Sequence, residues 1–147
     1  MITIRNITAN ETYPVRHSVL RKGQPFTSCC FEGDELNTTK HYGLFENDAL
    51  QGIISLYENA NRQFEATNQI QIRGMAVLEH NQGKGFGKEL VQYCENLLTE
   101  SDCQLIWFNA RENAIGFYQK LGYNIHGDAF DIEGIGKHYV MLKKLRI

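Results

Sequence analysis

The chain has 147 residues, of which 42% are hydrophobic and 22% are charged, and its formal net charge is −2. This composition and length are typical of a globular domain that buries its own core, so we expect residues 1–147 to form a single domain. The charge provides no electrostatic basis for binding nucleic acid. Neither a signal peptide nor a run approaching ~20 apolar residues is visible, so we expect a cytoplasmic protein with no membrane partner.

The four cysteines and five histidines show no metal-site pattern. Cys29 and Cys30 are adjacent, Cys94 and Cys103 are isolated, and no C-x-x-C spacing occurs. In a cytoplasmic chain such cysteines are expected to be free thiols or small buried apolar side chains. We therefore expect no metal.

The first half of the chain contains alternating and amphipathic patterns. Apolar and polar residues alternate over Met1–Thr8, which predicts a strand. Asn10 is expected to cap a helix that has Pro14 in its first turn. Residues 23–39 show no clear period, so we expect a long loop with room for one helical turn. A hairpin then follows, with strands at His41–Phe45 and Leu50–Tyr57.

The second half alternates buried strands with two amphipathic helices. Six apolar residues, spaced mostly three and four apart, predict one buried helical face: Phe86, Leu90, Val91, Cys94, Leu97 and Leu98. A second helical stripe is expected to end at Gly122 and contains Ala114, Phe117, Tyr118 and Leu121. Further strands are expected at Ile70–Leu78, Leu105–Phe108, Tyr123–Phe130 and Lys137–Leu145. The resulting order, β-α-β-β-β-α-β-α-β-β, predicts an α/β sandwich around one mixed sheet.

The segment from Gln82 to Lys88, of sequence QGKGFGK, joins a predicted strand to a predicted helix. Its three glycines can adopt positive φ and let a ligand approach bare backbone. Backbone N–H groups converge in such a loop, and the following helix adds the positive end of its dipole. The segment therefore predicts a binding site for phosphate or pyrophosphate.

Two common phosphate-binding motifs do not fit this segment. In a nucleotide-hydrolase loop a glycine would stand at Gln82 and a hydroxyl residue at Glu89. In a dinucleotide fingerprint the third glycine would fall on Lys88 or Leu90, depending on the register. A nucleotide-phosphate binder is therefore the weakest of the hypotheses that we consider.

The pattern Gln/Arg-x-x-Gly-x-Gly/Ala does fit, at Gln82, Gly85 and Gly87. This segment resembles the coenzyme A pyrophosphate loop of the GNAT N-acyltransferase superfamily. A second segment, Asn109–Tyr123, is similar to the superfamily pattern Ala-x-x-Phe/Leu-Tyr-x-x-x-Gly-Phe/Tyr. The resemblance implies a mostly antiparallel mixed sheet of about seven strands flanked by helices. It also implies that acetyl-CoA is the co-substrate.

The resemblance assigns coenzyme contacts residue by residue. The pyrophosphate would be held by Gln82, Gly83, Lys84, Gly85, Phe86, Gly87 and Lys88, although both lysines are also consistent with solvated surface residues. The pantetheine arm would pair with the strand at Met75, Ala76 and Val77. Gly74 permits a bulge in this strand and is equally consistent with close packing. Weaker contacts are Asn113, which would equally support a helix N-terminus, and Arg111, which would equally pair with a surface carboxylate.

Tyr118 is the residue that the resemblance marks as general acid, because a phenol can protonate the departing thiolate. The alternative is core packing, as for most helical tyrosines. Glu79 and His80 follow the central strand and are candidates for the general base, but both are also consistent with ordinary loop residues. His41, His126 and His138 are weaker candidates.

The resemblance implies an N-acetyltransferase that moves the acetyl group directly to a primary amine, by default that of a small molecule. The acceptor site is expected to be lined by the segment Cys29–Glu35, the turn region after Ile132 and Tyr139. Phe31, Glu32, Asp34 and Glu35 would suit a cationic amine, unless the acidic residues are simply solvated. The competing hypothesis is a noncatalytic sensor that binds acyl-CoA without turnover. The sequence does not identify the amine, and a homodimer is an assembly that it leaves open.

Overall fold

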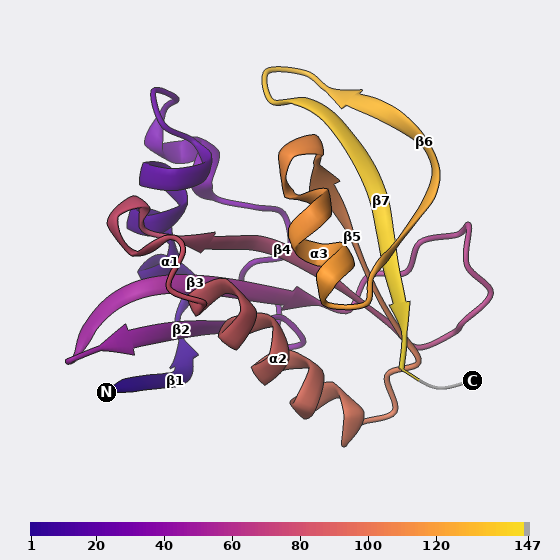
Figure 1. Ribbon diagram of the computed structural model, residues 1–147, viewed down its shortest axis with the longest axis horizontal. Helices are drawn as coiled ribbons and strands as arrows, with labels where there is room; N and C mark the ends of the chain where they lie inside the picture. The colour runs from indigo at the N-terminus through magenta and orange to yellow at the C-terminus, as the bar shows by residue number, and fades with distance from the viewer. Residues whose placement is uncertain (146–147) are drawn as a thin grey trace. The chain divides into compact units, whose positions relative to one another are not determined.

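The computed structural model describes residues 1–145 as a single mixed sheet of seven strands with three α-helices among the described residues (Figure 1). The strands are β1 (Ile2–Ile7), β2 (Lys40–Glu46), β3 (Ala49–Tyr57), β4 (Gln69–Val77), β5 (Leu105–Arg111), β6 (Asn124–Ile132) and β7 (Gly136–Lys144). The helices are α1 (Ala9–Val15), α2 (Phe86–Thr99) and α3 (Ile115–Lys120). The sheet order is β1-β2-β3-β4-β5-β7-β6, which confirms the predicted fold class and element order.

The chain divides into two compact units, and the division falls inside β4. Unit 1 comprises Met1–Tyr57 and Ile72–Glu100, and unit 2 comprises Glu58–Gln71 and the described residues from Ser101 onward. Within unit 1, β1 pairs with β2 and β2 with β3, both antiparallel. Within unit 2, the first three residues of β4 pair parallel with β5, and β7 pairs antiparallel with both β5 and β6.

Helix α1 begins two residues earlier than the sequence analysis predicts. Its N-cap is Thr8, whose side chain accepts from the Glu11 backbone N–H at 3.3 Å, while the Glu11 carboxylate accepts from the Thr8 N–H at 2.9 Å. This reciprocal capping box satisfies two backbone donors, and the lone Asn10 cap cannot match it. Pro14 consequently lies inside the helix, which continues as a π-helical turn over Arg16–Leu20.

The core of unit 1 lies on both faces of the sheet. Ile53 and Ala76 pack with Val15 of α1 in one buried cluster. On the opposite face, a Cβ added to Gly52 would lie 3.0 Å from Leu90 of α2, so the glycine allows the helix to approach β3 closely. Five of the six residues predicted for the buried face of α2 are buried, but Leu97 is 41% exposed. Leu97 lies at the edge of the apolar stripe, where the spacing does not determine burial.

A buried ion pair joins Arg16 to Asp34 in unit 1. Arg16 is 0% exposed, and its Nη1 donates to the Asp34 carboxylate at 2.7 Å and to the Cys29 carbonyl at 2.8 Å. Its Nη2 donates to the hydroxyls of Ser55 and Tyr57 on β3. The segment 23–39, predicted to be a loop with one helical turn, is held against β3 by these bonds and does contain a 3-10 turn, Phe26–Cys29.

His41 completes this network and is structural. Its Nε2 lies 2.9 Å from the Asp34 backbone carbonyl, which can only accept, so Nε2 carries the proton. Nδ1 then accepts from the Ser55 hydroxyl at 2.6 Å. The weak hypothesis that His41 is a base is therefore not supported, because both of its ring nitrogens are engaged inside the core.

Unit 2 is built around an aromatic cluster. Phe108 of β5 lies with its ring centroid 4.3 Å from that of Tyr118 and 5.0 Å from that of Tyr123. Helix α3 ends where the Tyr123 N–H donates to the Tyr118 carbonyl, and Gly122 has a φ of 97°. This is the glycine C-cap that the sequence predicts. Strand β5 is longer than expected, because β7 pairs with it along its whole length.

The Arg16–Asp34 pair predicts a large loss of stability for Asp34→Asn. Leaving one partner of a buried pair uncompensated typically costs about 3–5 kcal/mol. The control is Glu112→Gln, which removes an exposed pair with Lys137 and should cost less than about 1 kcal/mol. Urea unfolding followed by circular dichroism measures both variants. Similar losses would contradict the importance of the buried pair.

The same pair predicts an acid-sensitive stability. Burial by itself raises the pKa of the Asp34 carboxyl, but hydrogen bonds from Arg16, Tyr57 and the Phe31 N–H outweigh burial and lower it. The unfolded chain therefore takes up the proton first. The stabilisation is present above the unfolded pKa and is lost as pH falls through the folded value. Urea unfolding from pH 5 to 2 should show a steeper decline for the wild type than for Asp34→Asn.

Candidate functional site

The glycine loop has an open concave backbone at the start of α2. Gly83 and Gly85 have φ values of 87° and 85°, in the left-handed region that glycine adopts without strain. A Cβ built on either glycine would meet no atom within 4 Å, so the space beside the loop is free of other protein atoms. Strand β4, the 3-10 turn Glu79–Asn81, the loop and α2 follow each other as the sequence predicts.

Side chains fix this loop to the end of β4. Gln82 Nε2 donates to the Val77 carbonyl at 3.0 Å, and Lys84 Nζ donates to Asn81 Oδ1 at 2.7 Å. Asn81 in turn donates through Nδ2 to the side chain of Gln51 on β3. Gln82 and Lys84 therefore help to shape the loop, and Lys84 is more than a solvated surface lysine. Lys88 is exposed on the first turn of α2.

The electrostatics of the loop suit a pyrophosphate. Gly85 is the N-cap of α2 and has no side chain to accept from the first helical N–H groups. The first backbone N–H of α2 to donate in the helical pattern is that of Glu89, which bonds to the Gly85 carbonyl at 3.0 Å. The backbone N–H groups of Phe86, Gly87 and Lys88 precede it and have no acceptor within the helix. Such N–H groups, a helix dipole and two lysines are the features that favour an anion at a helix N-terminus.

Strand β4 leads into this loop and carries a kink. Gly74 has a φ of 66°, and a Cβ at this position would lie 3.2 Å from both Arg16 Nε and the Phe31 ring. Gly74 therefore has an irregular backbone and is also tightly packed, so the two explanations considered for this glycine do not exclude each other. After it, Met75 is half-buried and Ala76 and Val77 are buried.

Tyr118 of α3 has a buried ring, with 7% of the residue exposed. Its hydroxyl makes no hydrogen bond to any described residue. The one fully buried side-chain polar atom without a partner in the described chain is Arg16 Nε, so the Tyr118 hydroxyl retains access to solvent. Burial raises the pKa of the Tyr118 phenol, which keeps it protonated at neutral pH. A protonated, unbonded hydroxyl is what a proton donor requires.

The weaker sequence candidates lie in less constrained positions. Arg111, at the end of β5, is half-buried, and burial lowers the pKa of its guanidinium. Asn113 is exposed and caps neither the 3-10 turn Glu112–Ala114 nor α3. Glu79 and His80 are exposed in the 3-10 turn after β4. These side chains stay candidates.

One acidic residue of the loop expected to receive a cationic amine has a structural role instead. Asp34 is buried in an ion pair with Arg16, and of the three acidic residues only Glu32 and Glu35 are exposed. The sequence analysis missed two residues of this region, Arg16 and Arg73. Arg16 interrupts an apolar helical stripe and Arg73 interrupts an apolar strand. These two charged residues in otherwise apolar patterns were the features of the sequence that could have pointed to them.

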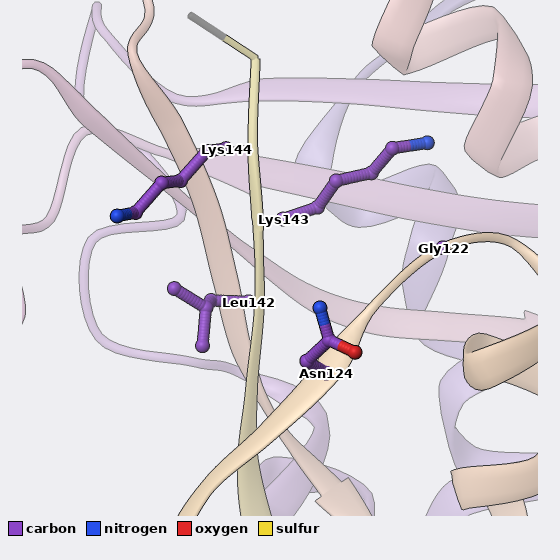
Figure 2. A pocket seen from close by; sticks show the side chains of 5 residues that line it. All are labelled: Gly122, Asn124, Leu142, Lys143 and Lys144. Atoms are coloured by element: carbon purple, nitrogen blue, oxygen red, sulfur yellow. The ribbon is translucent and has the colours of Figure 1, made fainter. Parts of the chain in front are cut away.

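A pocket of about 490 Å³ lies in unit 2 at the start of β6 and the end of β7 (Figure 2). Its lining consists of Gly122, Asn124, Leu142, Lys143 and Lys144. The two lysine side chains leave opposite sides of β7 in Figure 2. Lys143 Nζ donates to the Leu121 carbonyl at 2.9 Å and thus supports the end of α3. None of the predicted site residues lines this pocket.

Over the described residues, no group of histidine, cysteine and acidic side chains is arranged to hold a metal ion. Within the described residues none of the four cysteines forms a disulfide, and three of them are buried. Helices long and apolar enough to cross a membrane are not found in the described part of the chain.

Comparisons with known proteins identify the family of this chain. Residues 5–123 match the model of the acetyltransferase (GNAT) family. The chain is also 36% identical over 146 residues to the uncharacterized N-acetyltransferase YitI of Bacillus subtilis (strain 168), a match that covers 99% of this chain and 98% of that protein. The chain therefore belongs to the GNAT family of acetyltransferases, and it is an N-acetyltransferase.

Solved structures have the same fold at low sequence identity. An aminoglycoside 6'-N-acetyltransferase complexed with coenzyme A matches with a TM-score of 0.78 and 15% identity, covering 99% of this chain and 98% of the other. The ribosomal-protein-S18-alanine N-acetyltransferase from Escherichia coli matches with a TM-score of 0.79 and 15% identity, covering 100% and 96%. These matches confirm the fold, and the resemblance drawn from the two sequence motifs is confirmed at the level of the family.

The open glycine loop predicts that Gly85→Val abolishes binding of acetyl-CoA. The added side chain would occupy the space beside the loop and strain a backbone with positive φ. The matched control is Gly134→Val, because Gly134 has a φ of 80° and equally open surroundings in the β6–β7 turn. Isothermal titration with acetyl-CoA measures both variants. Normal binding by Gly85→Val would show that the loop does not hold the coenzyme.

Proposed function

We propose that this chain transfers the acetyl group of acetyl-CoA directly to a primary amine of a small molecule, without a covalent enzyme intermediate. The observation that carries the proposal is the open glycine loop at the uncapped N-terminus of α2. We also propose that residues 1–147 act as one acetyltransferase domain. Family membership supports the enzymatic reading over a noncatalytic acyl-CoA sensor.

The coenzyme would be held mainly by unit 1. Backbone N–H groups over 82–88 and the ammonium groups of Lys84 and Lys88 would bind the pyrophosphate. Backbone groups of Met75, Ala76 and Val77 would pair with the pantetheine arm, as the family resemblance implies. Arg111 and Asn113 are candidates for further coenzyme contacts. Acetyl-CoA itself supplies the activated thioester.

The residues of the chain would then transfer protons to the sulfur and from the amine, and would orient the amine beside the thioester. The nitrogen–carbon bond forms as the carbon–sulfur bond breaks, and Tyr118 would donate its phenolic proton to the departing sulfur. Holding the amine beside the thioester contributes much of the rate through proximity. An amine with a pKa of ~10 must first lose a proton. Glu79 and His80 are our candidates for its acceptor, acting directly or through water.

Binding of acetyl-CoA is tested by thermal unfolding. At about 1 mM ligand and a Kd of ~10 µM, binding adds roughly 2.7 kcal/mol, which corresponds to a rise of several degrees in Tm. ATP and NAD serve as controls and should produce no comparable rise. Thiol release is then measured with a panel of amines. A rise without turnover would assign the chain to the sensor class, and no rise would remove the main support for the proposal.

Tyr118→Phe should lower turnover by roughly 10²-fold while sparing acetyl-CoA binding, because it removes the proton donor and little else. The control is Tyr123→Phe, which removes a second hydroxyl from the same aromatic cluster. Steady-state thiol release as a function of pH measures the effect. Because burial raises the pKa of Tyr118, the wild-type rate should show no loss from its ionisation up to about pH 10. An unchanged rate in Tyr118→Phe would return this residue to core packing.

A further inference from the structure

Three guanidinium groups surround the ring of Phe31 in unit 1. Their central carbons lie 4.0 Å (Arg16), 5.2 Å (Arg21) and 4.6 Å (Arg73) from the ring centroid. Phe31 belongs to the segment that the sequence analysis assigns to the acceptor side. Three like charges beside one ring repel each other unless carboxylates or other acceptors compensate them, so the partners of each guanidinium decide what the cluster can bind.

Arg16 and Arg21 both have protein partners. Arg16 pairs with Asp34 at 2.7 Å, and Arg21 donates through Nη1 to the Leu20 carbonyl. Arg73 makes no hydrogen bond and no ion pair with any described residue. Its guanidinium instead lies against two rings, 4.6 Å from the centroid of Phe31 and 5.5 Å from that of Tyr57. Arg73 is half-buried, so it is partly dehydrated while all of its donors are free of protein partners.

Arg16 is close to β4 at the position next to Arg73. A Cβ built on Gly74, the residue that follows Arg73, would lie 3.2 Å from Arg16 Nε. This nitrogen is fully buried and has no hydrogen-bond partner among the described residues.

Arg73 is also close to the strand expected to hold the coenzyme. It precedes Met75 by two residues in β4, a separation of about 7 Å along a strand. Gly74, with its positive φ, lies between them. A group bound by Arg73 would therefore lie beside the part of β4 that we propose for the pantetheine arm.

We propose that Arg73 binds a carboxylate of the acceptor, so that the substrate class is amines that also carry a carboxylate, as amino acids do. This inference rests on the proposed function, because it names the acceptor of the same reaction. The planar guanidinium matches a carboxylate with two parallel hydrogen bonds, and the rings of Phe31 and Tyr57 hold it in orientation. The amine of such a substrate loses a proton to the base and attacks the acetyl carbon. The carbon–sulfur bond breaks, and coenzyme A leaves as the thiol after taking the proton of Tyr118.

The test uses matched acceptors and the full-length enzyme. Thiol release from acetyl-CoA is measured with the twenty amino acids, with their carboxamides and with their decarboxylated amines. Aminophosphonates form a further arm. We expect at least one amino acid to exceed its carboxamide in kcat/KM by about 10- to 100-fold, the range for a charged hydrogen bond. Arg73→Gln should bring that ratio close to one by raising KM for the amino acid.

Two controls separate this result from loss of structure. Arg62→Gln removes an exposed arginine of unit 2 and should leave the acid-to-amide ratio unchanged. Arg73→Gln should keep the Tm rise produced by acetyl-CoA, which reports an intact coenzyme site.

Each outcome bears on one proposal. Equal use of acids and amides, a preference for phosphonates, or an acid preference that survives in Arg73→Gln would overturn the carboxylate site. Acetyl-CoA binding without turnover of any amino acid would overturn it as well. Absence of both a Tm rise and thiol release would instead count against the proposed function.

Discussion

The buried Arg16–Asp34 ion pair is the interaction on which the arrangement of segment 23–39 in unit 1 depends. It connects the end of α1 to a loop without regular periodicity and, through Ser55 and Tyr57, to β3. Asp34 also accepts from the Phe31 N–H at 2.8 Å, so the same carboxylate positions the ring that Arg73 contacts. Charges removed from water in this way are stable only when they are paired and hydrogen-bonded. This requirement restricts segment 23–39 to a conformation in which Asp34 meets Arg16.

The glycine loop proposed to bind the coenzyme differs from this network, because the groups that it would use belong to the backbone. Glycines with positive φ expose N–H groups at the start of α2, and side chains of Gln82 and Lys84 fix the loop in that shape. Such a site recognises the geometry of a phosphate and is indifferent to what the rest of the ligand carries. Under our proposal, selectivity for the acceptor would come from side chains, among them Arg73, which lies over the ring of Phe31 in unit 1.

Elements whose signals are local could be predicted well. The hairpin turn at Asn47 and Asp48, the α2 stripe and the Gly122 cap all depend on neighbours within a few residues. Helix α1 was placed wrongly because a reciprocal capping box competes with a single asparagine cap. The role of Asp34 was wrong in part for another reason, since no local pattern distinguishes a solvated acidic loop residue from one that is paired in the core.

The sequence by itself determined the order of elements, the place of the glycine loop before α2 and the family, because these depend on short motifs and on periodicity. Tertiary structure alone decided that Arg16 meets Asp34 at a separation of 18 residues and Tyr57 at a separation of 41. It also decided that Arg73 lies against Phe31. Pairings of this kind depend on how distant segments pack around one core, and their geometry follows from burial and charge compensation summed over all the neighbours.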